Sequence, residues 1–164
     1  HHMEDPMAGW KVLTDCLESG GLMNIGLYSE LSRQHIVRMQ EEINQSRIGS
    51  SDDAIKLFRG NVINSSEQNH KNIRSFSDFY SLSELRDLLF HVQEHHFTIP
   101  QIKDCLSQLG LKFCGFESDK IVKNFKLMNT GADDPYDLDK WDLYEKDNPR
   151  SFAGMYQFWC QKVG

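Results

Sequence analysis

The sequence predicts an α/β fold in which a three-stranded mixed sheet carries a large helical insert. Three segments have the length and the apolar character of strands, Leu22–Tyr28, Leu111–Phe116 and Met155–Lys162. Residues 29–110, which begin after the first of these strands, are mostly helical in periodicity. A chain of 164 residues is long enough for one well-packed core, and we expect a single domain over residues 1–164.

The first predicted unit is a helix, a glycine turn and a strand. Asp5 is a suitable N-cap and Pro6 a suitable first helical residue. Gly20 and Gly21 end this helix and turn the chain into the first strand.

Within the helical insert, capping residues indicate where individual helices begin. A helix is expected over 29–45, and Ser51 caps the next one. Residues 64–75 are polar and predict an exposed loop. Ser81 with Glu84, and Thr98 with Gln101, form two capping boxes.

After the second strand, the pattern predicts two shorter helices and a final strand. The first helix surrounds Ile121, residues 129–135 form a loop, and Asp137 starts the second helix. The last strand places Tyr156, Phe158 and Cys160 on one face and the intervening residues on the other. The large apolar anchors are expected in the core: Trp10, Trp141, Trp159, Phe113 and Phe158.

Composition excludes several classes of protein. The net charge of −6 argues against nucleic-acid binding, and Lys120, Lys123 and Lys126 are expected to form a solvated helix face. No apolar run approaches the ~20 residues of a membrane span, and the polar N-terminus is not a signal peptide, so we expect a cytoplasmic protein. The four cysteines are expected to be buried free thiols: Cys16, Cys105, Cys114 and Cys160.

Several segments resemble class I S-adenosylmethionine-dependent methyltransferases. Asp5–Tyr28 is similar to the family's helix, glycine-pair turn and fifth strand. Phe97–Glu117 resembles its last helix and sixth strand, and Ser151–Lys162 its seventh strand. Asp78–Ile99 resembles bacterial methyltransferases that are often fused to tetratricopeptide repeats. The resemblance implies a partial Rossmann-like methyltransferase fold, the C-terminal half of such an enzyme.

The resemblance also implies what the chain lacks. The family holds its cofactor with a glycine-rich turn and with an acidic residue at the end of the second strand, whereas this chain has no G-x-G. We therefore expect S-adenosylmethionine in the complete parent protein, which would methylate an unidentified acceptor, and no cofactor bound to this chain alone. The alternative is a non-enzymatic helical interaction module that keeps a degenerate methyltransferase tail.

Candidate site residues lie at the start of the chain and at the end of the first strand. The tract His1–Pro6 fits the family's histidine pair followed by Asp-Pro, which implies that His1 and His2 are native and lie beside the cofactor. Two such histidines can also be the remnant of a purification tag. Tyr28, Ser29 and Glu30 are placed to line a substrate pocket, because ligands collect outside the carboxyl ends of strands. Packing of Tyr28 on the insert is the alternative.

His91, Glu94 and His95 match the H-x-x-E-H pattern of inverted zincins. On a helix the two histidines would share one face, where they could hold zinc. No third ligand is apparent, so we expect no metal. These residues are instead candidates for the substrate side of a methyltransferase, or ordinary polar residues at a helix end.

The final strand is expected at the centre of the sheet, antiparallel to both others. In the family fold, the strand like Leu22–Tyr28 has a neighbour on its other side, and that neighbour is missing from this chain. An apolar edge without proline or lysine favours pairing with another chain, so we expect a homo-oligomer through this edge. The competing outcome is that the helical insert covers the edge.

Overall fold

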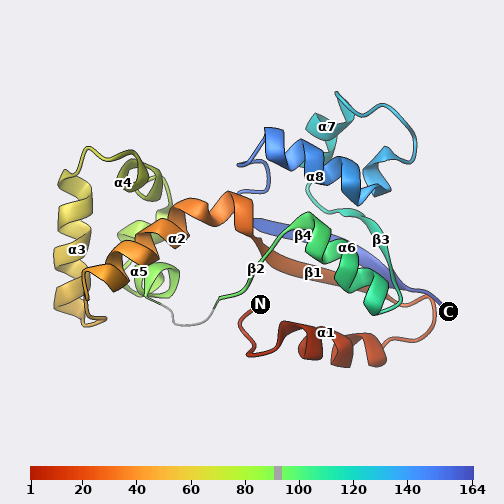
Figure 1. Ribbon diagram of the computed structural model, residues 1–164, viewed down its shortest axis with the longest axis horizontal. Helices are drawn as coiled ribbons and strands as arrows, with labels where there is room; N and C mark the ends of the chain where they lie inside the picture. The colour runs from red at the N-terminus through yellow and green to blue at the C-terminus, as the bar shows by residue number, and fades with distance from the viewer. Residues whose placement is uncertain (91–93) are drawn as a thin grey trace. The chain divides into compact units, whose positions relative to one another are not determined.

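The computed structural model describes residues 1–90 and 94–164, which form two compact units (Figure 1). One unit contains the described residues of 1–32 and 93–164, and the other those of 33–92. The elements, in chain order, are α1 (Pro6–Asp15), β1 (Leu22–Ser29), α2 (Glu30–Gln45), α3 (Asp52–Asn64), α4 (Gln68–Ile73), a 3-10 turn η1 (Ser77–Tyr80), α5 (Leu82–Leu89), β2 (His96–Phe97), α6 (Ile99–Gln108), β3 (Leu111–Phe116), α7 (Asp119–Lys126), a 3-10 turn η2 (Asp134–Tyr136), α8 (Leu138–Asp147) and β4 (Met155–Lys162).

The sheet has the strand order β2-β1-β4-β3, and β4 lies between β1 and β3, antiparallel to both. This arrangement confirms the expected central position of the last strand. The prediction of three strands was incomplete, because β2 adds a fourth that pairs in parallel with the end of β1. Its two residues are too few to show any periodicity in the sequence.

Strand register places one face of the sheet in a core. Ile25 of β1 lies opposite Phe158 of β4, and Leu27 lies opposite Tyr156, and all four side chains are buried. The alternation predicted for β4 is confirmed. Trp159 was wrongly assigned to the core: it points to the other face and is 40% exposed, as strand alternation requires of a residue next to Phe158.

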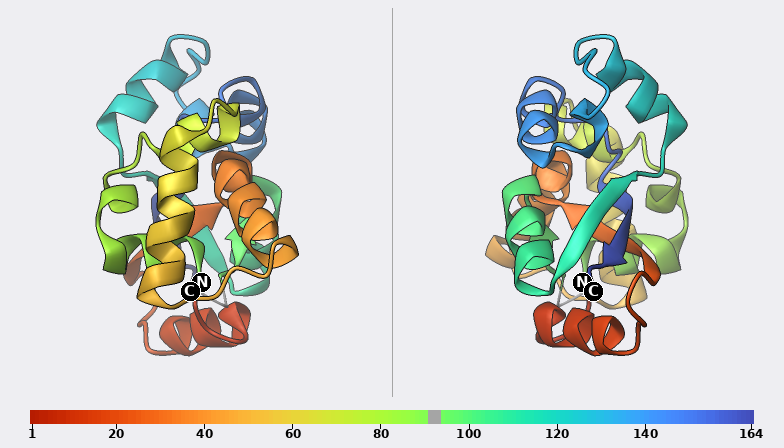
Figure 2. Two further views of the ribbon diagram at one scale, coloured as in Figure 1. Left: turned by 90° about the vertical axis from the view of Figure 1, so that its left-hand side faces the viewer. Right: turned by 90° about the vertical axis from the view of Figure 1, so that its right-hand side faces the viewer.

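Helices α1, α6, α7 and α8 complete the core of this unit. Trp10 of α1 contacts Phe158, with ring centroids 6.1 Å apart. Trp141 of α8 stacks on Phe125 of α7 at 3.7 Å, and its indole N–H donates to the carbonyl of Pro135. Figure 2 shows β3, β4 and β1 side by side, and α6 and α8 join the same core cluster as these strands.

The helical unit has a core of its own, built by the buried faces of α2, α3, α4, η1 and α5. Ile36, Met39 and Ile43 of α2 belong to the same cluster as Ile55 and Phe58 of α3. Residues 64–75 were predicted as an exposed loop, but they contain α4. Its His70 and Ile73 are both buried, so two inward positions one turn apart suffice to hold a short, otherwise polar helix.

The predicted helix starts are confirmed by their hydrogen bonds, but the capping box predicted at α5 is only half formed: Ser81 accepts from the N–H of Glu84, without the reciprocal bond from the Glu84 side chain. Asp5 accepts from the N–H of Ala8, and Ser51 from that of Ala54. Thr98 and Gln101 form a reciprocal capping box at α6. These caps satisfy orphan N–H groups in the first turn, which is why their sequence signals are reliable.

Surface properties follow the sequence only in part. Lys120, Lys123 and Lys126 are exposed as predicted. The prediction that all four cysteines are buried was wrong, because Cys16 is exposed and Cys114 partly so, although all four are free thiols. Among the described residues, no helix is both long and apolar enough to cross a membrane.

The outer edge of β1 is only partly covered. β2 pairs with Tyr28 and Ser29, and within the described residues no other strand lies beside Leu22–Leu27 on that side. The ring Nδ1 of His1 donates to the carbonyl of Gly26 over 3.0 Å and so satisfies one edge acceptor. Leu22 remains 56% exposed at the start of the strand. Oligomer formation through this edge therefore stays a prediction.

We expect sedimentation equilibrium at micromolar concentration to show a homodimer or higher oligomer of the 19.1-kDa chain. Leu22→Lys should shift the equilibrium toward monomer, because a lysine on an edge strand opposes pairing. Leu57→Lys, on the 70% exposed Leu57 of α3, is the matched control and should not. A single species near 19.1 kDa for the unchanged chain would rule out the oligomer.

Candidate functional site

The candidate site is built at the carboxyl end of β1, where β2 begins. Tyr28 lies opposite His96 in the parallel pairing, and Ser29 lies opposite Phe97. Because successive residues of a strand point to opposite faces, buried Ser29 points inward and half-buried Tyr28 points to the other face. The site therefore has an outer part around Tyr28 and an inner part around Ser29.

The outer part is a cluster of aromatic rings around Tyr28. The ring centroid of Tyr28 lies 4.3 Å from that of His1, 5.7 Å from that of His2 and 6.3 Å from that of His96. His1 and His2 also contact each other at 4.3 Å. Two of these rings come from the first residues of the chain and two from adjacent strands, so the cluster joins three distant segments.

A carboxylate–imidazole pair borders this cluster. Nε2 of His96 lies 2.6 Å from Oε1 of Glu94, and the two side chains are 15% and 6% exposed. The backbone N–H of His95 donates to the carbonyl of His1 over 3.0 Å, which ties the chain start to this segment. The ring Nε2 of His95 is buried and has no hydrogen-bond partner among the described residues.

The residues that the sequence singled out are partly brought together. His1, His2, Tyr28, Glu94 and His95 lie in or beside the cluster. Glu30 begins α2 and is exposed. His91 lies outside the described residues.

The helical geometry assumed for Glu94 and His95 of the H-x-x-E-H pattern was wrong. Helix α5 ends at Leu89, and neither Glu94 nor His95 is helical. Sequence analysis missed His96, the residue that pairs with Glu94. The H-x-x-E-H pattern implies histidines at i, i+4 spacing, whereas the observed pair has the i, i+2 spacing of extended backbone.

The inner part of the site is a buried hydrogen-bond network centred on Glu145 of α8. Its carboxylate accepts from the hydroxyls of Ser29 and Tyr156, each over 2.7 Å. The Ser29 oxygen in turn accepts from the N–H of Ser32 in the first turn of α2. One carboxylate therefore joins β1, β4, α8 and the start of α2.

Burial governs the proton affinities of this network. Desolvation raises the pKa of Glu145 above its usual value, and the two hydroxyl donors offset part of that increase. Burial, and then the neighbouring Glu145, raise the pKa of Tyr156, so its phenol remains a hydrogen-bond donor. The sequence did not predict this network, because Glu145 is 11 residues from Tyr156 and 116 residues from Ser29.

Chemically, the outer cluster can orient an acceptor and hold a proton. A carboxylate beside an imidazole fixes the tautomer and direction of the ring, which is the arrangement of a general base. The aromatic rings supply an apolar wall next to that polar pair. Among the described residues no three histidine, cysteine or acidic side chains are arranged to hold a metal ion.

We predict that Glu145→Gln changes how stability depends on pH. Because the folded pKa of Glu145 is raised, the folded chain keeps this proton at pH values where the unfolded chain has lost it. The free energy of unfolding of the unchanged protein, minus that of the variant, should therefore decrease as pH rises above the ordinary value of 4.5. Denaturant titrations over a pH series measure this difference.

The control is Glu30→Gln, which changes an exposed carboxyl and should leave the pH profile unchanged. A difference between wild type and Glu145→Gln that stays constant, or grows with pH, would contradict the role assigned to burial.

The absence of metal also remains a prediction. Elemental analysis of the untagged chain, purified without chelating resin, should find zinc well below one atom per chain. Stoichiometric zinc that disappears in His91→Ala and His95→Ala would show that the H-x-x-E-H residues do hold a metal ion.

Comparison with known proteins gives a fold but no family. No family model matches the chain. An uncharacterized protein of Synechococcus sp. is 28% identical over 158 residues, which cover 88% of this chain and 37% of that protein. The chain thus spans little more than a third of the length of this relative.

Solved structures share the fold at low identity. The structure of PKMT2 from Rickettsia typhi matches with a TM-score of 0.63 and 10% identity. PKMT2 in complex with AdoHcy matches with a TM-score of 0.58 and 13% identity. Each match covers 94% of this chain and 31% of the other. The mixed α/β fold of this chain is therefore one that PKMT2 contains.

Proposed function

We propose that this chain is the C-terminal part of a bacterial S-adenosylmethionine-dependent methyltransferase of the kind often fused to tetratricopeptide repeats. The acceptor of the methyl group is unidentified. The observation that carries the proposal is the fold shared with PKMT2, which has been solved with AdoHcy. AdoHcy is what S-adenosylmethionine becomes once its methyl group has been transferred.

The proposal places the cofactor site outside this chain. It has no G-x-G turn, and the site cluster is made of rings and a carboxylate, not of exposed backbone amides that approach a ligand. The chain spans about a third of the length of its matches, and the proposal assigns the cofactor-binding half to a longer parent protein.

The outer cluster is the proposed acceptor side. It lies at the carboxyl end of a strand, where ligands of open α/β sheets collect. Tyr28 and His96 would contact the acceptor, and Glu94 would orient the His96 ring. His1 and His2 would lie toward the cofactor, as the resemblance implies.

A second candidate function is a non-enzymatic helical interaction module. It is favoured by one observation: the described residues of 33–92 form a compact unit with a core that does not depend on the sheet. The sequence upstream of residue 1 in the gene separates the two functions. An in-frame strand, a G-x-G turn and a second strand ending in Asp or Glu would support the enzyme.

We predict that this chain alone binds S-adenosylmethionine weakly or not at all. Titration calorimetry should show a Kd weaker than about 1 mM, because no glycine-rich turn is present. A micromolar Kd would contradict the assignment of the cofactor site to another part of the protein.

In the longer parent protein, Glu94→Gln should lower methyl transfer more than it changes the affinity for S-adenosylmethionine. The acceptor is unidentified, so the activity assay follows AdoHcy release with a cell extract as the acceptor source. Glu30→Gln is the matched control. If Glu94→Gln and Glu30→Gln are equally active, Glu94 has no role on the acceptor side.

A further inference from the structure

Helix α7 and the loop that follows it carry a basic and apolar surface that the proposed function does not use. Lys120, Lys123 and Lys126 are exposed, and none of them forms an ion pair with a side chain that the structure describes. Lys103, Lys140 and Lys146, in contrast, each pair with an aspartate. The three α7 lysines are therefore unneutralised within a chain whose net charge is −6.

Two large apolar side chains follow this row of lysines. Leu127 is 80% exposed and Met128 63% exposed, immediately after the last residue of α7. Lys120, Lys123 and Leu127 follow the i, i+3, i+7 spacing of one helix face. The opposite side of α7 is anchored by Phe125, which is fully buried against Trp141. The exposed face is thus presented on a helix that its own core holds in place.

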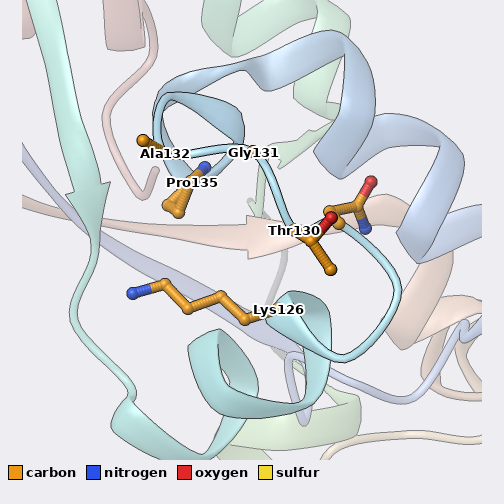
Figure 3. Close-up of a pocket in the computed structure, with 6 residues that line it drawn as sticks. Lys126, Thr130, Gly131, Ala132 and Pro135 are labelled. Atoms are coloured by element: carbon orange, nitrogen blue, oxygen red, sulfur yellow. The ribbon is translucent and has the colours of Figure 1, made fainter.

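Two cavities flank α7. One, of about 430 Å³, is lined by Lys126, Asn129, Thr130, Gly131, Ala132 and Pro135. Figure 3 shows the Lys126 side chain lying opposite Ala132 and Pro135, with Thr130 beside it. The other, of about 400 Å³, lies on the α8 side and includes Asn124, Arg150 and Ser151 in its lining. The Ser151 hydroxyl is buried and has no hydrogen-bond partner among the described residues.

We propose that this surface binds an acidic peptide segment, with carboxylates on the lysine row and an apolar side chain on Leu127 and Met128. Unpaired cations complement carboxylates, and apolar groups beside them bury apolar surface of a peptide, which free ions cannot offer. Arg150 extends the positive charge to the second cavity. Neither the carboxylates nor the apolar contact requires the cluster around Tyr28, so the proposal is independent of methyl transfer.

The cavities and the charge balance favour a peptide over the other polyanions. A membrane surface offers no side chains to fill two cavities of this size. Nucleic acid generally needs a wider basic surface, and here the rest of the chain is acidic. Successive lysines of the row are one helical turn apart, and an extended segment with glutamates at alternate positions presents carboxylates all on one side.

The test uses a fluorescein-labelled peptide in which glutamate alternates with leucine. Fluorescence anisotropy with the whole chain at low ionic strength should show saturable binding that weakens as salt is added. The double variant Lys123→Glu with Lys126→Glu should bind at least about tenfold more weakly. Leu127→Ser with Met128→Ser should also weaken binding, but it should change the salt dependence of binding less than the double lysine variant does.

Matched controls separate this surface from general charge effects. Lys71→Glu with Lys112→Glu reverses the same number of exposed lysines elsewhere and should keep the original affinity to within about twofold. Leu57→Ser removes an exposed leucine of α3 and should have no effect. Circular dichroism of every variant should be unchanged, because all of these side chains are exposed.

Three results would overturn the proposal. The first is no peptide binding at low salt. The second is equal loss of binding in the α7 and control variants. The third is α7-dependent binding to phosphatidylserine vesicles, or to single-stranded DNA, that is tighter than binding to the peptide.

Discussion

The hydrogen bonds to the Glu145 carboxylate are the constraint on which the rest of the sheet unit depends. Burying a carboxylate is costly unless donors compensate it, and here hydroxyls from Ser29 and Tyr156 do so. Because Ser29 also accepts from the first turn of α2, the end of β1 and the start of the helical segment share one anchor.

This inner anchor determines the geometry of the outer cluster. Ser29 and Tyr28 are adjacent in a strand, so fixing the inward side chain of one fixes the outward direction of the other. Tyr28 then contacts the rings of His1, His2 and His96 on the other face of the sheet. Ser29 and Glu145, which are buried on the opposite face of the sheet, thus position the candidate site without being part of its exposed surface.

Sequence reasoning succeeded wherever a local rule sufficed. The strands of six to eight residues, the glycine turns and the caps at Asp5, Ser51 and Thr98 all follow from patterns within one element. It failed where tertiary contact decides. The two residues of β2 are extended because they pair with the end of β1, and α4 forms because His70 and Ile73 are buried. For the site, Tyr28 followed from the rule for strand ends, whereas Glu145 and the Glu94–His96 pair depend on contacts that no spacing indicates.

Helix α8 connects the two surfaces that the chain presents. Trp141 and Glu145 are four residues apart, so they lie on the same buried face, where one stacks on Phe125 of α7 and the other holds Ser29 of β1. Helix α7, which carries the exposed lysines, and strand β1, which carries Tyr28, consequently both pack on α8, through Phe125 and Ser29 respectively. Substitutions at either surface leave this buried face intact, whereas a change to Trp141 or Glu145 removes the common support. Exposed residues of the α7 surface and of the cluster around Tyr28 can for this reason be substituted independently of each other. A single substitution that impairs the function of both surfaces would point to a disturbed α8.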